Sequence, residues 1–474
     1  MSTAEGLARR ARGRARRKLL IEAIAVLGAT AIGAGVVFLV YRHSIGSPWH
    51  VAGMAVQNVS HAEGIQTEVA VAADPSHPSV LFAASNESLE PEIRVYSSTN
   101  GGRRWSAAAG PTFNPNTCAW GDPSVAVARD GRQYVAFTEK SICIQGPDLT
   151  PYLVVASRPG PQGKWTVRRV TRPAVKFGFD DKPAISVGGD GRAYVAWSRL
   201  LGRAYQTTVV SSSSDGGKTW TPPRVVDRKL AQPQLVTVAA AGRRTLYIAG
   251  VDARYGLWIG RSTDGGQSFA LRRAAPLPGN RASTCLVFGK FVLPQQAVRC
   301  LGPNPTLSVG RGRVYLTYDV NGPDLTQDAA LAVFSPSLKP MWRGPIGPTK
   351  KKADQFWPAS AYDAQTGRLW ACFYDTTGDS DRRHAWFSCT ATRDGRQWAT
   401  PVRVTGPSAS AEVLWEDARI YGFGDNGGWG GYVGLTAANG KAHALWVDTR
   451  DLGGNQEEIF GGTLSARALE QRQG

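Results

Sequence analysis

Short apolar stretches with alternating polar residues recur along most of the chain and predict β-strands. Each recurring unit pairs a strand, often opened by Pro, with a Gly or Asp-Gly turn and a second strand rich in aromatic residues. Seven copies begin at Thr67, Pro123, Pro183, Pro233, Pro305, Pro358 and Gly431. Their spacing is about 60 residues, which leaves room for four short strands in each unit.

A unit of this kind cannot bury both of its faces alone, so the pattern predicts four-stranded antiparallel sheets arranged radially, an all-β β-propeller. We predict seven blades, with six as the alternative if one unit is an insertion. From Gly431 the chain has room for only three more strands, and the segment 47–60 has strand-like apolar content. We therefore expect this segment to supply the missing outer strand of a propeller over 47–466, followed by a flexible tail at 467–474.

A long apolar segment precedes the repeats. Residues 19–41 carry one charge, Glu22, and are numerous enough to cross a bilayer as a helix. Seven Arg and Lys residues lie before it within 1–18, whereas Arg42 is alone in the next twenty residues. The positive-inside rule then predicts a cytoplasmic tail, a transmembrane signal-anchor helix, a short linker at 42–46 and an extracytoplasmic propeller. The chain would be a single-pass protein of the cell membrane. A cleaved secretory signal and a buried helix of a globular protein are the alternatives.

Composition narrows the possible partners. The 474 residues are 42% hydrophobic and 19% charged, which excludes a disordered polymer. The formal net charge is +18, and about a third of it lies in the tail before the apolar segment. Because export would remove the rest from the cytoplasm, we expect no nucleic-acid binding. The basic surface of the exported part instead predicts contact with anionic envelope components.

Six cysteines, an even number, agree with export to a compartment where disulfides form. The stretches 368–374 and 384–390 predict two strands around a polar turn, with Cys372 opposite Cys389. Cross-strand neighbours are close enough to form a disulfide. The remaining connectivity is open. No CxxC motif is present and the six histidines are scattered, so the sequence does not favour a zinc site.

Four units carry a second motif, a Ser/Thr-x-Asp-x-Gly-x-x-Trp-like pattern. The copies are SSTNGGRRW (97–105), SSSDGGKTW (212–220), STDGGQSF (262–269) and TRDGRQW (392–398). An Asp side chain that bonds to nearby amides and a Gly with positive φ together predict a tight turn. The motif resembles the Asp-box, or BNR, repeat of sialidases and sialidase-like propellers. The resemblance implies that Asp215, Asp264 and Asp394 are fold determinants on the face opposite the active site.

Acidic residues recur where one face of the propeller would form the mouth of its channel. The starts of the innermost strands carry Asp122, Asp180, Asp181, Asp354 and Asp425, and the second strands end in Glu139, Asp252, Asp319, Asp375 and Asp448. We predict an acidic ring in which Asp181, Asp354, Asp375, Asp425 and Asp448 bind a ligand. Converging oxygen ligands make Ca²⁺ the candidate cofactor. A turn-capping role is the alternative for each residue.

Two functions compete. The first is an exo-sialidase-type glycoside hydrolase. Arg199, Arg254 and Arg450 would clamp the substrate carboxylate. The nucleophile would be Tyr421 or Tyr255, assisted by Glu416, and the acid would be Asp122. The family's Phe/Tyr-Arg-Ile-Pro segment is absent, since the nearest sequence, around Arg94, has no Pro. We therefore favour the second function, a membrane-anchored, non-catalytic binding or scaffold module for envelope glycan or protein. Surface ion pairs are the structural alternative for the arginines.

Overall fold

The described residues lie within one compact unit, 51–474. The computed structural model describes residues 56–87, 93–113, 117–140, 151–171, 178–201, 205–230, 233–252, 256–275, 304–321, 326–347, 353–380, 382, 384–404, 431–448 and 457–470. The predicted membrane segment 19–41 and its flanks lie outside these residues, so the anchor stays a prediction. Within the described ranges, no helix combines the length and apolar character needed to cross a membrane.

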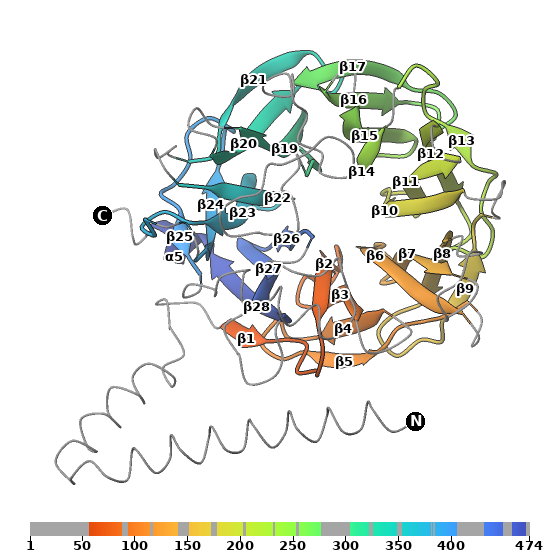
Figure 1. Ribbon diagram of the computed structural model, residues 1–474, viewed down its shortest axis with the longest axis horizontal. Coiled ribbons are helices and arrows are strands. Elements are labelled where there is room, and N and C mark those ends of the chain that lie inside the picture. The colour runs from red at the N-terminus through yellow and green to blue at the C-terminus, as the bar shows by residue number, and fades with distance from the viewer. Residues whose placement is uncertain are drawn as a thin grey trace, which may run out of the picture. The chain divides into compact units, whose positions relative to one another are not determined.

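Seven four-stranded antiparallel sheets are arranged in a ring around a central axis and confirm the seven-bladed propeller (Figure 1). In blades 1 to 6 the strand order follows the chain from the centre outward. Blades 1, 2 and 3 are formed by β2 (Gln66–Ala73), β3 (Leu81–Glu87), β4 (Arg94–Ser98), β5 (Ser106–Ala109), β6 (Cys118–Val127), β7 (Gln133–Lys140), β8 (Tyr152–Arg158), β9 (Thr166–Arg169), β10 (Phe179–Val187), β11 (Ala193–Leu201), β12 (Tyr205–Ser213) and β13 (Arg224–Val225).

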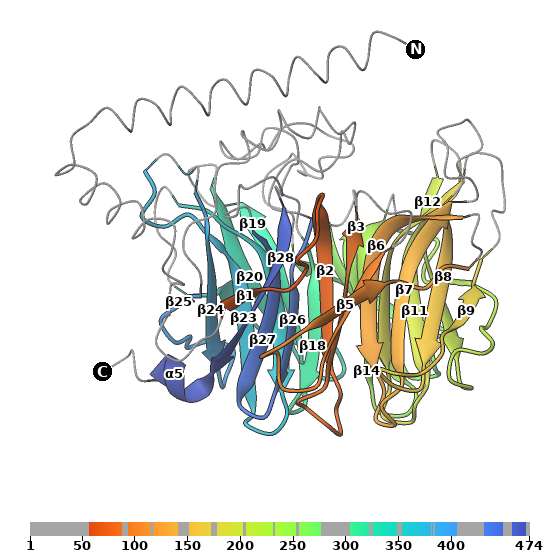
Figure 2. The ribbon, with the colours of Figure 1, turned by 90° about the horizontal axis from the view of Figure 1, so that it is seen from below.

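Blades 4, 5 and 6 repeat the same arrangement. They are formed by β14 (Gln234–Ala241), β15 (Thr245–Asp252), β16 (Gly256–Ser262), β17 (Ala270–Ala275), β18 (Thr306–Gly310), β19 (Arg313–Asn321), β20 (Gln327–Phe334), β21 (Pro340–Pro345), β22 (Gln355–Asp363), β23 (Arg368–Asp375), β24 (Trp386–Thr392) and β25 (Val402–Arg403). Because the strands are antiparallel, the starts of innermost strands and the ends of second strands share one face, here called the mouth (Figure 2).

Blade 7 closes the ring with strands from both ends of the described chain. It contains β26 (Gly434–Ala438), β27 (Lys441–Asp448), β28 (Glu458–Ser465) and, outermost, β1 (Val56–Asn58). Strand β1 pairs with β28, with Val56 opposite Gly462 and Asn58 opposite Phe460. The outer strand thus comes from within 47–60, the segment for which the sequence predicts this role.

Within the predicted tail at 467–474, the structure describes residues up to 470, and these belong to a helix. A short helix, α5 (Ala466–Glu470), buries Ala468 and Leu469 in the core shared by blades 6 and 7. Arg368 on β23 forms an ion pair with Glu470. Packing against the neighbouring blade orders this segment, and one turn of helix is too short to show an amphipathic period in sequence.

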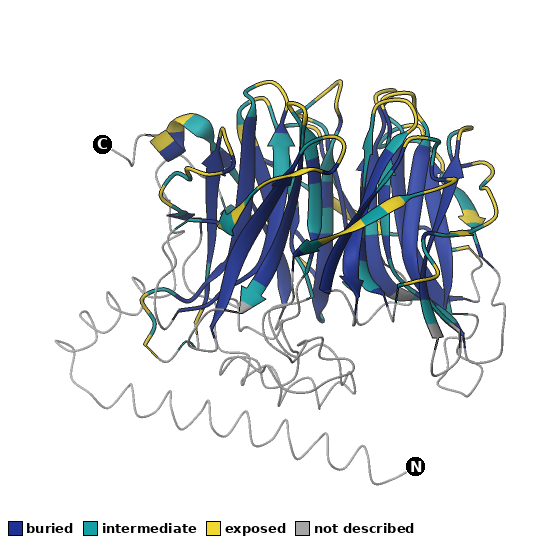
Figure 3. Cartoon of the chain, turned by 90° about the horizontal axis from the view of Figure 1, so that it is seen from above, coloured by how far each residue is buried: buried dark blue, intermediate teal, exposed yellow. Residues whose placement is uncertain are grey.

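The hydrophobic core consists of layers between neighbouring blades, and exposed residues lie mainly in the turns (Figure 3). Strand β11 illustrates how alternation builds these layers. Val195 and Trp197 pack against blade 2, whereas Tyr194 and Ala196 pack against blade 4. Because successive side chains of a strand point to opposite faces, one strand of alternating character serves two layers.

The four Asp-box turns join the third and fourth strands of their blades, on the face opposite the mouth, as the resemblance implies. In blade 3, Ser213 Oγ donates to Asp215 Oδ1 (2.7 Å) and accepts the Gly217 amide hydrogen bond (2.9 Å). Asp215 Oδ1 also accepts the amides of Lys218 and Thr219 (3.0 Å each). These hydrogen bonds, with that from the Thr219 hydroxyl the strongest, lower the pKa of Asp215. Asp264 and Asp394 are held similarly.

The predicted disulfide joins the second and third strands of blade 6. Cys372 lies opposite Cys389 in the ladder between β23 and β24, and the two are bonded. Cys118 is also disulfide-bonded. The other cysteines lie outside the described residues.

Candidate functional site at the channel mouth

The innermost strands of five blades share a β-bulge near the mouth. At each bulge the register with the second strand shifts, and one residue has a left-handed backbone with φ between 47° and 58°. These residues are Glu68, Asp122, Lys182, Leu235 and Trp357. A bulge inserts an extra residue and re-aims its side chain. In blades 1 to 3 the bulge residues meet at the mouth, whereas Trp357 is buried in the core of blades 6 and 7.

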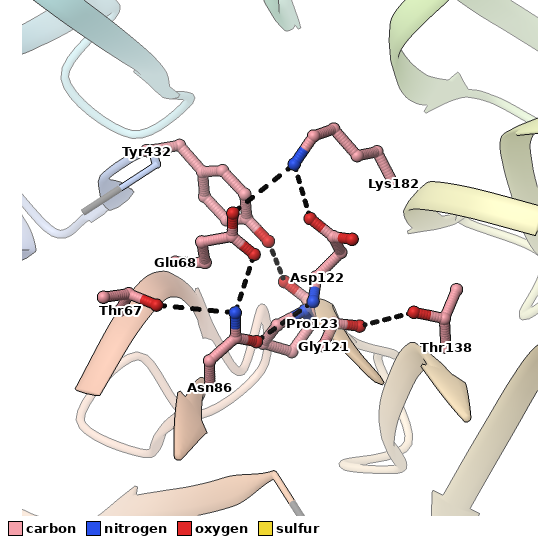
Figure 4. Close-up of polar contacts among 9 residues, drawn as sticks. All are labelled: Thr67, Glu68, Asn86, Gly121, Asp122, Pro123, Thr138, Lys182 and Tyr432. Carbon is pink, nitrogen blue, oxygen red and sulfur yellow. Dashed lines mark hydrogen bonds and ion pairs between the residues drawn. The ribbon is translucent and has the colours of Figure 1, made fainter. Parts of the chain in front are cut away.

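The bulge of blade 2 requires glycine beside it. Gly121 has φ of 128°, and a Cβ there would lie 2.8 Å from Asn86 Oδ1. This close approach lets the Asp122 amide donate to Asn86 Oδ1 (3.0 Å), while Thr138 Oγ1 donates to the Gly121 carbonyl (3.0 Å) (Figure 4). Asn86 Nδ2 in turn donates to Glu68 Oε2 (2.8 Å). Asn86 therefore ties the bulges of blades 1 and 2 together.

Three bulge residues from consecutive blades meet at the mouth (Figure 4). Lys182 Nζ lies 2.6 Å from Asp122 Oδ1 and 3.4 Å from Glu68 Oε1. Tyr432, just before β26, donates from its hydroxyl to the Pro123 carbonyl (3.2 Å), and its ring centroid is 5.8 Å from Lys182 Nζ. We call Glu68, Asp122, Asp181 and Lys182 the mouth cluster. With Tyr432 it joins blades 7, 1, 2 and 3.

The mouth cluster combines three carboxyl groups with one ammonium group in a largely buried setting. The side chains of Glu68 and Asp122 are 4% and 9% exposed. Burial raises the pKa of Asp122 well above its usual value, the Glu68 charge raises it further, and Lys182 only partly opposes this. Burial also raises the pKa of Asp181, against the effect of Lys182. The cluster therefore favours retention of a proton among its carboxyls. The cluster can thus offer a ligand hydrogen-bond acceptors, a protonated carboxyl group and the ammonium group of Lys182.

The adjacent Asp180 and Asp181 have different surroundings. Asp180 is buried within blade 3, where its Oδ1 accepts hydrogen bonds from Arg199 Nε (2.8 Å) and Trp197 Nε1 (2.7 Å). The Arg199 guanidinium also lies 5.4 Å from the Trp197 ring centroid. Arg199, a predicted member of a carboxylate clamp, is thus already paired with a carboxylate of its own blade.

The other described members of the predicted acidic ring are buried and bonded within the fold. Asp354 accepts the Gln327 amide (3.0 Å) and pairs with Arg382 (3.2 Å), and burial raises its pKa to about 6. Asp375 accepts the Thr377 amide (2.7 Å), and Asp448 accepts Trp446 Nε1 (2.9 Å). These three carboxyls stabilise loops and side chains, a role closer to the turn-capping alternative than to an open ring.

Asp319 and Glu139 are buried in the same manner at the ends of second strands. Asp319 accepts the amides of Asn304 (3.1 Å) and Trp357 (2.8 Å), and burial raises its pKa to about 8. Glu139 accepts the Phe113 amide (2.8 Å), and burial raises its pKa. Asp319 thereby connects blade 5 to the innermost strand of blade 6, whereas Glu139 holds the segment that enters its own blade.

Sequence reasoning placed Asp122 and Asp181 at the mouth but missed Glu68, Asn86 and Lys182. The signal was present in the unit alignment, because Asp122 and Lys182 directly precede the Pro that opens their units and Glu68 occupies the equivalent position. The other proposed residues lie outside the described part of the chain and stay predictions, namely Arg254, Arg450, Tyr255, Tyr421, Glu416 and Asp425.

Metal binding receives no support from the described residues. Among them, no group of three or more His, Cys, Asp or Glu side chains is arranged to hold a metal ion. In the mouth cluster, the ammonium of Lys182 lies between the carboxyls of Asp122 and Glu68, where a Ca²⁺ ion would need to bind.

A closed ring of seven blades with Asp-box turns is the architecture of a sialidase-like propeller. The BNR repeat-like domain matches residues 36–274, just over half of the sequence, and the chain belongs to this family. No curated protein matches it.

Similar solved structures include enzymes and a protein bound to a peptide. The Hadza microbial sialidase Hz136 is 13% identical, with 83% of this chain and 75% of that chain covered and a TM-score of 0.44. The leech intramolecular trans-sialidase is 10% identical, with coverage of 88% and 94% and a TM-score of 0.42. YCF48 bound to D1 peptide is 11% identical, with coverage of 87% and 97% and a TM-score of 0.45. At these identities the likeness concerns the fold alone.

Proposed function

We propose that this chain is a membrane-anchored, extracytoplasmic propeller that binds a neutral or amino-bearing envelope glycan at its mouth without hydrolysing it. The observation that carries the proposal is the convergence of Glu68, Asp122 and Lys182 from three blades. Carboxyl oxygens accept hydrogen bonds from sugar hydroxyls, and the ammonium group donates to them. Because three carboxyl groups surround a single ammonium group, the mouth cluster disfavours binding of an anionic ligand such as the carboxylate of a sialic acid.

The alternative, an exo-sialidase-type hydrolase, would need guanidinium groups free to clamp a carboxylate. Arg199 is paired with Asp180 through its Nε (2.8 Å). Removing Arg199 from that pair would leave a buried carboxylate without its counter-ion, which costs about 3–5 kcal/mol. This cost supports binding over hydrolysis. Arg254 and Arg450 lie outside the described residues and are tested directly below.

The full chain, purified in detergent, tests the ligand class on immobilised neutral, amino-bearing and sialylated glycans. We expect retention on neutral or amino-bearing glycans and at least tenfold weaker binding for Asp122→Asn and Glu68→Gln. Asp130→Asn, an exposed acid on the opposite face, serves as the control. Binding confined to sialylated glycans, or equal effects of all three variants, would contradict the proposal.

Hydrolysis is measured separately with a fluorogenic sialoside between about pH 4 and 8, a range that covers the usual catalytic carboxyls. We expect no release of the fluorophore. If the wild type releases the fluorophore and Arg450→Ala does not, the chain is a hydrolase and the binding proposal is wrong.

Anchoring has its own test. Alkaline phosphatase fused to the C-terminus gains activity only when it is exported, so an active fusion that stays with the membrane fraction supports the proposed orientation. An active fusion released into the soluble fraction would instead indicate a cleaved signal.

A further inference from the structure

A crevice lies on the face opposite the mouth, between blades 5 and 6. Its volume is about 260 Å³, and it is lined by Arg313, Val333, Met341, Trp342, Asp394 and Arg396. These residues come from β19, β20, β21 and the Asp-box turn of blade 6. The function proposed for the mouth does not involve this crevice, so the two can be tested independently.

The crevice presents apolar surface to solvent. Met341 is 45% exposed, and among the described residues Phe113 is the only other large apolar side chain classed as exposed. Trp342 lies across Gly344, where an added Cβ would come within 2.4 Å of the indole, so glycine lets the ring lie along β21. Val333 is buried, and the Asp-box Gly395 packs against it. Trp342 is partly buried against the core of blades 5 and 6, so the crevice combines an exposed Met with a fixed Trp beside arginine, a composition typical of binding hot spots.

Two arginines, Arg313 and Arg396, line this apolar surface. Arg313 Nη1 donates to the Asp394 carbonyl (2.8 Å), which fixes Arg313 beside the crevice. Arg396 is exposed. Neither arginine forms an ion pair with any described residue.

Asp394 is the acidic member of this surface, and its carboxylate is already used. Partial burial opposes ionisation, but hydrogen bonds from the amides of Arg396 and Gln397 outweigh it and lower the pKa of Asp394. Its Oδ1 accepts those amides at 2.7 and 2.9 Å. The side chain therefore holds the turn and does not neutralise the arginines through ion pairs.

We propose that this crevice binds an extended acidic segment of a partner protein, with one apolar side chain between Met341 and Trp342 and flanking carboxylates on Arg313 and Arg396. Charge complementarity favours an acidic partner. The volume is below the roughly 300–1,000 Å³ of small-molecule pockets and suits a single side chain. Strand β21 is the outermost strand of blade 5, and among the described strands it pairs with β20 alone, so its outer edge can pair with an extended peptide.

The proposal is tested with a random decapeptide display library selected on the full chain and counter-selected on Arg396→Glu. We expect enriched peptides to carry one apolar residue flanked by Asp or Glu. Synthetic copies should bind Arg396→Glu and Trp342→Ala at least tenfold more weakly than the wild type, measured by fluorescence anisotropy. Arg132→Glu is the matched control, because Arg132 lies against the Asp-box turn of blade 3 at Gly216.

If Trp342→Ala fails to fold, Arg396→Glu still tests the proposal. The Arg396 side chain is exposed, and this residue contributes to the turn through its main-chain amide. Peptides that bind the wild type and Arg396→Glu equally, or no enrichment above the counter-selection, would overturn the proposal. Binding of sodium alginate that Arg396→Glu weakens, without any peptide binding, would reassign the crevice to an anionic polysaccharide.

Discussion

Replacing Lys182 by Met removes the ammonium group of the mouth cluster while keeping most of the side-chain volume. Its Nζ lies 2.6 Å from Asp122 and 3.4 Å from Glu68, whose side chains are 9% and 4% exposed. Removing one partner of a buried ion pair costs about 3–5 kcal/mol. Because the Lys182 side chain is 25% exposed, we expect the lower end, a loss of about 3 kcal/mol in the free energy of unfolding at pH 7. For a domain of this size that corresponds to a Tm lower by about 3–6 °C.

The stability that Lys182→Met loses depends on pH, because Lys182 affects the pKa of Asp122. Burial raises the pKa of Asp122, so the folded state favours the protonated carboxyl. Stability from this group is fully present below its unfolded pKa and is lost as pH rises through the folded pKa. Without Lys182 the folded pKa rises further, so Lys182→Met should lose less stability at pH 5 than at pH 7.

Calorimetry at the two pH values, at one scan rate, measures the effect. The control is Lys218→Met, which removes an exposed lysine from the Asp-box turn of the same blade and should change Tm little. Equal Tm values for the two variants at pH 7 would refute the reasoning. So would a larger loss for Lys182→Met at pH 5 than at pH 7.

Three further predictions concern buried groups outside the mouth cluster. Burial raises the pKa of Asp319 to about 8, so its stabilising contribution is lost as pH rises through 8. Asp319→Asn should remove a slope of about 1 kcal/mol per pH unit between about pH 6 and 8 in urea titrations. Burial lowers the pKa of His443 to about 4, so stability from the neutral ring is lost as pH falls from about 6.5 to 4. His443→Gln should flatten this acid limb, and an unchanged limb would contradict the assignment. Replacing both Cys372 and Cys389 by Ala opens a loop with a sequence separation of 17 and should lower the free energy of unfolding by about 3 kcal/mol. An unchanged urea midpoint would show that the disulfide contributes nothing to stability.

Local sequence patterns predict most of the fold. The alternation in strands such as β11 follows from side chains pointing to opposite faces, and the repeat spacing follows from four strands per blade. The Asp-box hydrogen bonds of Asp215 reach residues within four positions, so the motif alone predicts the turn. The pairing of Cys372 with Cys389 likewise depends on one hairpin. These interactions are short in sequence, which makes them predictable without knowledge of the neighbouring blades.

By itself the sequence determined the ring of seven sheets, its closure by the N-terminal strand and the face that carries the Asp boxes. Only the tertiary structure decided which polar groups meet at the mouth. Lys182 is 114 residues from Glu68 and 60 from Asp122, and the three converge because each sits in a bulge that departs from strict alternation. Asp180 and Asp181 are successive residues just before the bulge of β10, so Asp180 is buried with Arg199 while Asp181 belongs to the mouth cluster. Whether a carboxyl faces the channel or the core depends on contacts between blades, which strand periodicity does not encode.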